Sequence, residues 1–323
     1  MTAHRRLLTA LLPPCLVLLA TVLAVQPGTA AATPVRLLVP AYANPCCDAG
    51  PAMWTALLAT ATQLGDGIGL ILNPASGPGA ARDGNFLDAA GTGPLASFHA
   101  AGGKVYAYVA TGYATRPLAD VYQEVNAYYE FYGAAFVDGI FFDEMSNDLA
   151  DTGYYRALAA HVRAHAPGAL VFGNPGTGFV TNPSAQTTWT ELDYATALDV
   201  LMTFEDSAAA YRANDTAPAW VSNLDAGRVA HVVHGLAGWD PALLALARAR
   251  NAGYLYFTDD RMPNPYDALA TFWAAEVAAV SAPSPARAPA TPVPLGGATL
   301  LLAPLLGALG WRAARRPGER ALA

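Results

Sequence analysis

The sequence predicts one closed (β/α)₈ barrel, and three observations lead to this prediction. Short apolar runs alternate with helical stretches eight times between residues 33 and 280. Near-continuous apolar strands that alternate with helices indicate a parallel sheet whose outer face is covered. The region is about 250 residues long, the usual size of such a barrel, and no Pro/Ser-rich linker divides it. Eight units in this length fit a closed barrel better than an open doubly wound sheet.

The expected elements follow from the periodicity of apolar residues, and the fifth and sixth units have the weakest pattern. We expect strands at Val35–Pro40, Gly67–Asn73, Lys104–Ala110, Gly139–Asp143, Ala169–Asn174, Leu198–Glu205, Arg228–Val233 and Gly253–Thr258. We expect amphipathic or Ala-rich helices at Ala52–Gln63, Gly93–Ala101, Pro117–Gly133, Tyr154–Ala166, Trp189–Thr196, Ser207–Asn214, Pro241–Ala252 and Tyr266–Val280.

The N-terminal residues 1–32 have the pattern of a cleaved signal peptide. Two arginines precede an apolar run over residues 7–25, and small residues follow up to Ala32. An uncleaved membrane anchor is the alternative, which Pro13 and Pro14 disfavour because they interrupt the run. We therefore expect the domain at 33–280 to be exported.

The C-terminal residues have a different composition from the domain. Residues 281–294 are rich in Pro and Ala, which is typical of a semi-rigid linker. Residues 295–323 contain an apolar stretch followed by four arginines, as in a membrane anchor whose end lies in the cytoplasm. The arrangement also resembles bacterial sorting signals of the PEP-CTERM or rhombosortase type. Both interpretations place the protein at the cell surface or outside the cell, with membrane contact through the C-terminal segment.

The charge of the domain restricts its partners. Seven of the 18 basic residues, but only one of the 25 acidic residues, lie in the two terminal regions. The domain therefore has 11 basic and 24 acidic residues, a net charge near −13. Such a surface disfavours nucleic acid and anionic lipid, and it tolerates a neutral or cationic glycan. We expect a monomer.

No cofactor or metal site is expected. No Gly-rich phosphate-binding motif follows a strand. His161 and His165 share a helix face but have no third ligand, and Cys46-Cys47 is not a metal-binding spacing. In an oxidising compartment, these two cysteines form either a vicinal disulfide or two separate thiols. The domain's one lysine, Lys104, begins a strand, which disfavours Schiff-base chemistry at the strand ends.

Carboxylates follow two of the expected strands, at the edge where such barrels have their active sites. Asp143 and Glu144 end the fourth strand, and Glu205 ends the sixth. Glycoside hydrolysis uses two carboxyl groups on either side of the scissile bond, and apolar neighbours can raise the pKa of one of them. Adjacent strand residues point to opposite sides, so Asp143 and Glu144 cannot both point inward if the strand stays regular.

The candidate substrate-binding residues also lie at strand ends. Aromatic rings stack on the flat C–H faces of sugars, and amides and hydroxyls bind their polar groups. The candidates are Tyr42, Asn44, Asn73, Tyr108, Tyr113, Asn174, Thr203 and Tyr256, with Trp220 as a further aromatic residue. His231 and His234 lie three residues apart at the end of the seventh strand, so they face opposite sides; we expect a packed histidine, with a histidine that lines the site as the alternative. We expect Asp259-Asp260 to form a turn and an ion pair.

Six blocks of sequence near the strand ends are distinctive. They are Leu38–Tyr42, Leu72–Gly79, Tyr108–Tyr113, Val137–Glu144, Gly173–Gly176 and Thr203–Glu205. In this order they resemble the spherulin-4-like proteins, a family that includes glycoside hydrolase family 135. The resemblance extends from about Val35 to Val280. The vicinal cysteines at 46 and 47 depart from the family pattern.

The resemblance implies a (β/α)₈ barrel with endo-α-1,4-N-acetylgalactosaminidase activity on galactosaminogalactan, a biofilm exopolysaccharide. It also implies that Asp143, Glu144 and Glu205 are the required acids. In a retaining mechanism, Asp143 is the nucleophile and Glu205 the acid/base. The alternative function is a non-catalytic glycan-binding or coat protein that uses the same cleft. Deacetylation, a third hypothesis, would require a metal, for which the sequence offers no ligand set.

Overall fold

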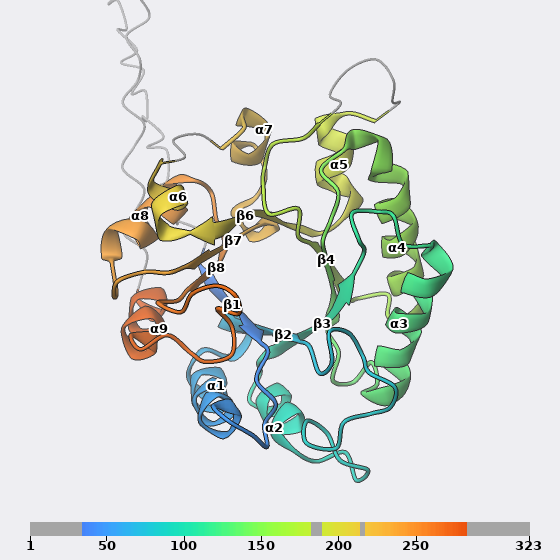
Figure 1. The fold of residues 1–323 in the computed structure, drawn as a ribbon, viewed down its shortest axis with the longest axis vertical. Coiled ribbons are helices and arrows are strands. Elements are labelled where there is room, and N and C mark those ends of the chain that lie inside the picture. Colours follow the sequence, from blue (N-terminus) through green and yellow to red (C-terminus); the bar gives the residue numbers. More distant parts are fainter. Residues whose placement is uncertain (1–33, 182–188, 214–216, 283–323) are drawn as a thin grey trace, which may run out of the picture. The chain divides into compact units, whose positions relative to one another are not determined.

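The computed structural model describes residues 34–181, 189–213 and 217–282, and its eight strands form a closed parallel barrel in chain order (Figure 1). The strands are β1 (Arg36–Ala41), β2 (Ile68–Leu72), β3 (Lys104–Ala110), β4 (Gly139–Asp143), β5 (Leu170–Gly173), β6 (Val200–Ser207), β7 (Val229–His234) and β8 (Tyr254–Phe257). The predicted fold class is therefore confirmed, and each strand begins and ends within two residues of its predicted bounds.

Helices surround the barrel (Figure 1). They are α1 (Gly50–Leu64), α2 (Pro94–Ala100), α3 (Leu118–Phe131), α4 (Thr152–His165), α5 (Glu191–Ala197), α6 (Ala208–Ala213), α7 (Ala219–Ser222), α8 (Pro241–Ala249) and α9 (Trp273–Ser281). The short α7 was not predicted. Within the described ranges, no helix has both the length and the apolar composition to cross a bilayer. The predicted signal peptide at 1–32 and the C-terminal segment at 295–323 lie outside the described residues, as does all but the start of the linker at 281–294.

Aromatic side chains fill the barrel interior at its N-terminal end. The rings of Tyr106 and Phe172 lie 4.3 Å apart between centroids, and Phe172 lies 5.3 Å from Tyr254. These residues belong to β3, β5 and β8, which are not neighbours in the sheet, so their contact must cross the barrel axis. The barrel is consequently a packed core, and a ligand has to approach from one of its ends.

The seam between β8 and β1 is only partly closed by backbone hydrogen bonds. The two strands pair at Arg36 with Tyr254 and at Leu37 with Leu255, and no further. Pro40 has no N–H to donate further along this seam. The Phe257 N–H instead donates to the Glu276 carboxyl group of α9, at 2.8 Å. The C-terminal half of the seam is therefore open to other parts of the chain.

Residues 258–272 enter this opening, and here the predicted last helix was wrong at its start. The helix was expected from Tyr266, but α9 begins at Trp273. The Asp259 carboxylate accepts from the Thr271 N–H at 3.0 Å, which closes the preceding residues into a loop. The Tyr42 N–H donates to the Tyr266 carbonyl at 3.3 Å, so the loop takes the place of the missing strand pairing.

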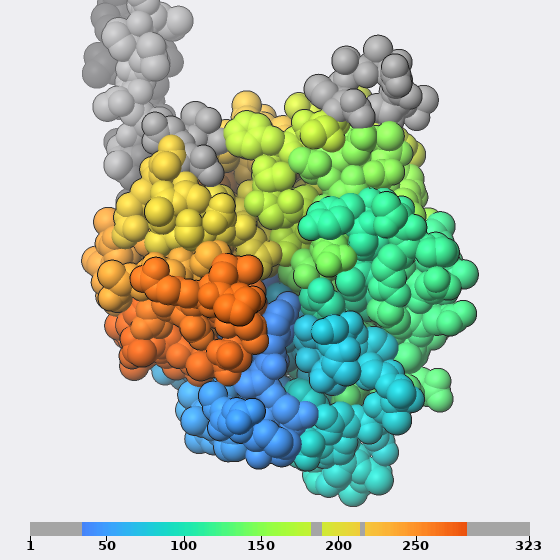
Figure 2. Space-filling view, in the orientation of Figure 1, coloured from blue at the N-terminus to red at the C-terminus, as the bar shows by residue number. Residues whose placement is uncertain are grey.

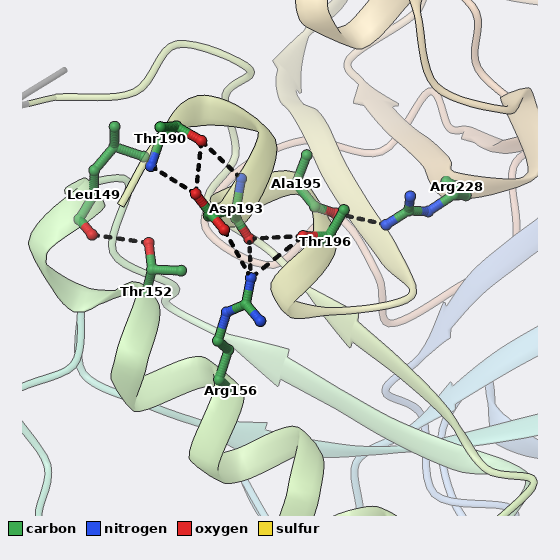
Figure 3. A network of polar contacts seen from close by, with 8 residues as sticks. All are labelled: Leu149, Thr152, Arg156, Thr190, Asp193, Ala195, Thr196 and Arg228. Atoms are coloured by element: carbon green, nitrogen blue, oxygen red, sulfur yellow. Dashed lines mark hydrogen bonds and ion pairs between the residues drawn. The ribbon is translucent and has the colours of Figure 1, made fainter. Parts of the chain in front are cut away.

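A polar network fixes α5, which follows the strand end of β5 (Figure 3). Thr190 and Asp193 form a capping box at the start of the helix. Arg156 of α4 donates to the Asp193 carboxylate at 3.2 Å, and Arg228 donates to the Ala195 carbonyl at 2.6 Å. These bonds hold α5 to α4 through Arg156 and to the residue before β7 through Arg228.

Candidate active site

Three side chains meet at the C-terminal ends of β4, β5 and β6. The Nδ2 of Asn174 donates to Oδ1 of Asp143 at 2.7 Å and also to Oε2 of Glu205. Hydrogen bonds of this kind are no longer than about 3.2 Å, so with the 2.7 Å bond to Asp143 the two carboxylate oxygens lie within about 5.9 Å of each other. The structure therefore brings together the predicted acids of β4 and β6, with a predicted binding residue between them.

Glu205 has a second hydrogen-bond donor that the sequence analysis missed. The Tyr266 hydroxyl donates to Oε1 of Glu205 at 2.6 Å. Burial, followed by the nearby Asp143 carboxylate, raises the pKa of Glu205, while the bonds from Tyr266 and Asn174 act in the opposite direction. The balance is a raised pKa, which favours a carboxyl group that holds its proton above its ordinary range.

A β-bulge turns Glu205 toward the cleft. The register between β6 and β7 shifts between Met202 and Phe204. Phe204 packs against Tyr211 of α6, outside the barrel, with ring centroids 4.6 Å apart. The Thr203 hydroxyl lies 3.0 Å from Nε2 of His231 on β7. Bulges commonly re-aim a side chain next to an active site.

Thr203, predicted to bind substrate, has its hydroxyl engaged by a histidine of the neighbouring strand. Its side chain is 7% exposed, and its hydroxyl joins the bulged part of β6 to His231 of β7. Nδ1 of His231 lies 2.7 Å from the Tyr211 hydroxyl, so both ring nitrogens have partners. Burial lowers the pKa of His231 to about 3, so the ring is neutral and packed in the core, as predicted.

Glu144 does not continue the alternation of β4. Its φ is +49°, a left-handed conformation, and its side chain is exposed. Burial, then Asp143 and also Glu144, raise the pKa of Tyr108 on β3, so both carboxylates lie near this phenol. The expectation that the two acids face opposite sides assumed a regular strand. The strand ends at Asp143, and the left-handed residue after it breaks the pattern.

Three tyrosines line the site around the two acids. The Tyr42 ring meets Tyr108 and Tyr266 edge-on, at centroid distances of 5.9 and 5.6 Å. A cleft of about 500 Å³ lies beside them, where Figure 2 shows the surface hollowed next to the orange segment. Its lining consists of Tyr42, Glu205, Asp206, His234, Tyr266 and residues 262–265. Its volume falls within the range of small-molecule sites.

Tyr113 lies on the rim, and two predicted asparagines support the rim loops. Tyr113 is 64% exposed, with a left-handed φ of +55°. Nδ2 of Asn44 donates to Oδ2 of Asp83 at 2.7 Å, and Oδ1 of Asn73 accepts from the Gly77 N–H at 2.9 Å. These asparagine side chains hold the loops after β1 and β2 and are occupied by those contacts.

Tyr256, predicted to bind substrate, packs against Tyr266, with ring centroids 6.5 Å apart, and is not part of the cleft lining. Its side chain is fully buried, packs against Trp273 of α9, and donates to the Ala268 carbonyl at 3.4 Å. Tyr266 takes the position near the acids that Tyr256 was expected to occupy. The available signal was Asn264-Pro265-Tyr266, an aromatic residue after a turn, which the predicted helix obscured. Trp220 packs against Tyr194 beneath α5.

The vicinal cysteines, the histidine pair of α4 and the lysine of β3 have defined contacts in the structure. Cys46 and Cys47 form a disulfide on the exposed loop after β1, which decides between the two open alternatives. The rings of His161 and His165 stack on Tyr122 and Tyr129. Lys104 pairs with Asp138 at the opposite end of the barrel. In the part of the chain that the structure describes, no three metal-ligating side chains are grouped.

Comparison with known proteins agrees with this architecture. Spherulin-4 of Physarum polycephalum is 32% identical over 144 residues, 45% of this chain and 40% of that protein. The match thus spans about two fifths of that relative's length. Aspergillus clavatus Sph3, solved in complex with GalNAc, has a similar fold, with a TM-score of 0.61 at 23% identity over 79% of this chain and 99% of that one.

The model of a family described as spherulation-specific family 4 matches residues 36–280, from the first strand of the barrel to its last helix. The predicted resemblance is therefore confirmed over the whole barrel, and the chain belongs to the spherulation-specific family 4.

Proposed function

We propose that this chain is an exported glycoside hydrolase that cleaves an amino-sugar exopolysaccharide. One observation supports this above all, the Asp143–Asn174–Glu205 arrangement at the C-terminal end of the barrel. Two carboxyl groups on either side of a glycosidic bond are the usual requirement of this reaction, and this barrel end is the usual place for them.

The distance between the acids favours a retaining mechanism. Retaining pairs stand about 5–5.5 Å apart, whereas inverting pairs need about 6.5–9.5 Å to admit a water molecule. The bound of about 5.9 Å set by the shared Asn174 nitrogen lies below the inverting range. Glu205, whose pKa is raised, protonates the leaving oxygen while Asp143 attacks the anomeric carbon. Glu205 then takes a proton from water as the water oxygen attacks the anomeric carbon, and the bond from that carbon to Asp143 breaks to release the sugar.

The substrate proposed is a galactosaminogalactan-like polymer with α-1,4-linked GalNAc or GalN units, cut internally. The Tyr42 ring, which lines the cleft, offers an aromatic surface for a sugar beside the acids, and the exposed Tyr113 offers a further contact on the rim. Glu144, near Tyr108, is the third acid proposed to be required. The binding of GalNAc by the similarly folded Sph3 supports the choice of sugar.

The terminal regions support a location outside the cytoplasm. We propose that residues 1–32 direct export, and that residues 295–323 serve as an anchor or sorting signal joined by the linker at 281–294. The polymer would then be cleaved at the cell surface or in the medium.

The experiment compares purified wild type with Glu205→Gln on a partly deacetylated α-1,4-galactosamine polymer, with products analysed by mass spectrometry. We expect oligosaccharides from wild type alone, because Gln cannot donate the proton to the leaving oxygen. Glu130→Gln, an exposed change on α3, is the matched control and should behave as wild type. Polymer binding without products from any variant would instead favour the glycan-binding or coat function.

A further inference from the structure

The loop of residues 258–272 places one side chain against the proposed acid/base. Tyr266 is 7% exposed, and its backbone replaces the missing β8–β1 pairing through the bond from the Tyr42 N–H. Its ring packs edge-on against Tyr42, at 5.6 Å and an interplanar angle of 87°. These contacts leave its hydroxyl directed at Oε1 of Glu205.

We propose that Tyr266 is a positioning residue that holds Glu205 in both of its protonation states and sets the pH at which Glu205 exchanges its proton. The proposal rests on the proposed function only for the role of Glu205 in the reaction. The hydrogen-bond geometry is independent of which glycan is cleaved.

The two hydrogen-bond partners of Glu205 differ in what they can donate and accept. Asn174 faces Oε2 with an amide nitrogen, because its own Oδ1 accepts from the Gly176 N–H at 2.9 Å. An amide nitrogen only donates, so it cannot accept a proton carried on Oε2. A hydroxyl both donates and accepts. The proton of Glu205 therefore belongs on Oε1, and the Tyr266 hydroxyl turns from donor to acceptor as that proton arrives.

Other titratable groups also surround Glu205, and they affect both its ionised form and its protonated form. Asp143 faces it from β4, Asp206 and His234 line the same cleft, and the phenols of Tyr42 and Tyr108 complete the surroundings. None of these contributes the hydrogen bond to Oε1. Removing the Tyr266 hydroxyl takes a charge-assisted hydrogen bond from the carboxylate and only a weaker neutral one from the protonated acid, so Glu205 should bind its proton more tightly.

The first test is the pH profile of Tyr266→Phe in the full chain. Loss of one charge-assisted hydrogen bond should move the basic limb of kcat/KM, which reports Glu205 as acid, upward by about one pH unit. Tyr129→Phe is the matched control, because the Tyr129 hydroxyl is buried on α3 without a hydrogen-bond partner. A purely structural role would lower the rate and leave the limb in place.

The second test follows the Glu205 carboxyl carbon directly by ¹³C NMR titration, with Glu205→Gln to assign the signal. The titration midpoint should rise in Tyr266→Phe and stay unchanged in Tyr129→Phe. An unchanged midpoint in Tyr266→Phe overturns the proposal. If wild type cleaves no glycan while the midpoint moves as expected, the proposed function fails and this inference stands.

A third variant covers the case in which Tyr266→Phe does not fold. Replacing Tyr266 with 3,5-difluorotyrosine keeps the ring in place and makes the hydroxyl a stronger donor. The Glu205 midpoint should then move to lower pH, and a midpoint that does not move contradicts the proposal.

Discussion

At the end of β5, Asn174 donates from one nitrogen to carboxylates on the two neighbouring strands. The orientation of the amide follows from its other contact, because Oδ1 accepts from the Gly176 N–H. The side chain is 7% exposed, so its geometry is held by packing as well as by hydrogen bonds. One neutral residue thereby keeps two acids at the separation that the proposed reaction needs.

Removing the Asn174 side chain should impair the reaction more than the fold. Asn174→Ala is expected to lower kcat by about 10²-fold, because a displacement of about 1 Å at a reacting group has an effect of that size. Asn174→Asp should be worse at neutral pH, since it places a third carboxyl group between two others. Steady-state kinetics measures both, with Asn126→Ala on the exposed face of α3 as control. Unchanged kcat in Asn174→Ala would remove Asn174 from the site.

At the scale of one strand, the bulge in β6 determines where Glu205 points. Regular alternation would direct Thr203 and Glu205 to the same side. The register shift instead places Thr203 against His231 and lets Glu205 face the barrel axis. His231, neutral because burial lowers its pKa to about 3, bridges Thr203 and Tyr211 and so holds the bulge. His231 therefore affects the position of Glu205 indirectly, by stabilising the conformation of β6.

Thr203→Val tests this arrangement, because it removes the hydroxyl and keeps the shape of the side chain. The buried Nε2 of His231 then loses its partner, and we expect the free energy of unfolding to fall by about 1–3 kcal/mol. Urea unfolding followed by circular dichroism measures the change. Thr62→Val, on the exposed face of α1, controls for the substitution itself and should change stability by less than about 0.5 kcal/mol. Equal effects in the two variants would contradict the role of His231.

At the scale of the molecule, barrel closure depends on close approach between neighbouring strands. Gly139 begins β4 and pairs with Leu170 of β5. A Cβ atom added there would lie 2.0 Å from the Leu170 carbonyl oxygen, so the two backbones cannot keep their register around a side chain. The same register sets the ends of β4 and β5 side by side, so that Asp143 and Asn174 lie at the same height along the barrel.

Gly139→Ala should therefore weaken both the fold and the site. We expect a loss of about 3 kcal/mol in the free energy of unfolding, at the upper end of the usual effect of overpacking. Gly168→Ala is the matched control, since no atom lies within 4 Å of the added Cβ. It should be neutral or slightly stabilising. Thermal unfolding compares the two, and a Gly139→Ala protein as stable as its control would show that the barrel tolerates a wider gap at this pair.

Much of the fold and part of the site could be predicted from local patterns. Apolar runs and helical periodicity located all eight strands, and carboxylates after two of them indicated Asp143 and Glu205. The failures have physical causes. The helix expected from Tyr266 was placed too early because an apolar, Ala-rich pattern does not show where a loop inserts into an open seam. Regular alternation also does not reveal that a bulge sets Thr203 against His231, or that Tyr256 packs against α9 and Tyr266.

The fold class and the family could be recognised from local patterns, since strand length, helix period and strand-end motifs are properties of short stretches of the chain. Which side chains meet depends on the folded barrel. Asn174 reaches Glu205 across 31 residues, and Tyr266 reaches it across 61. The Tyr266 contact exists because Pro40 cannot donate and β8 leaves β1 early, which opens the seam that Tyr266 enters. Contacts of this kind depend on how the ends of the sheet close, which no short stretch of sequence contains.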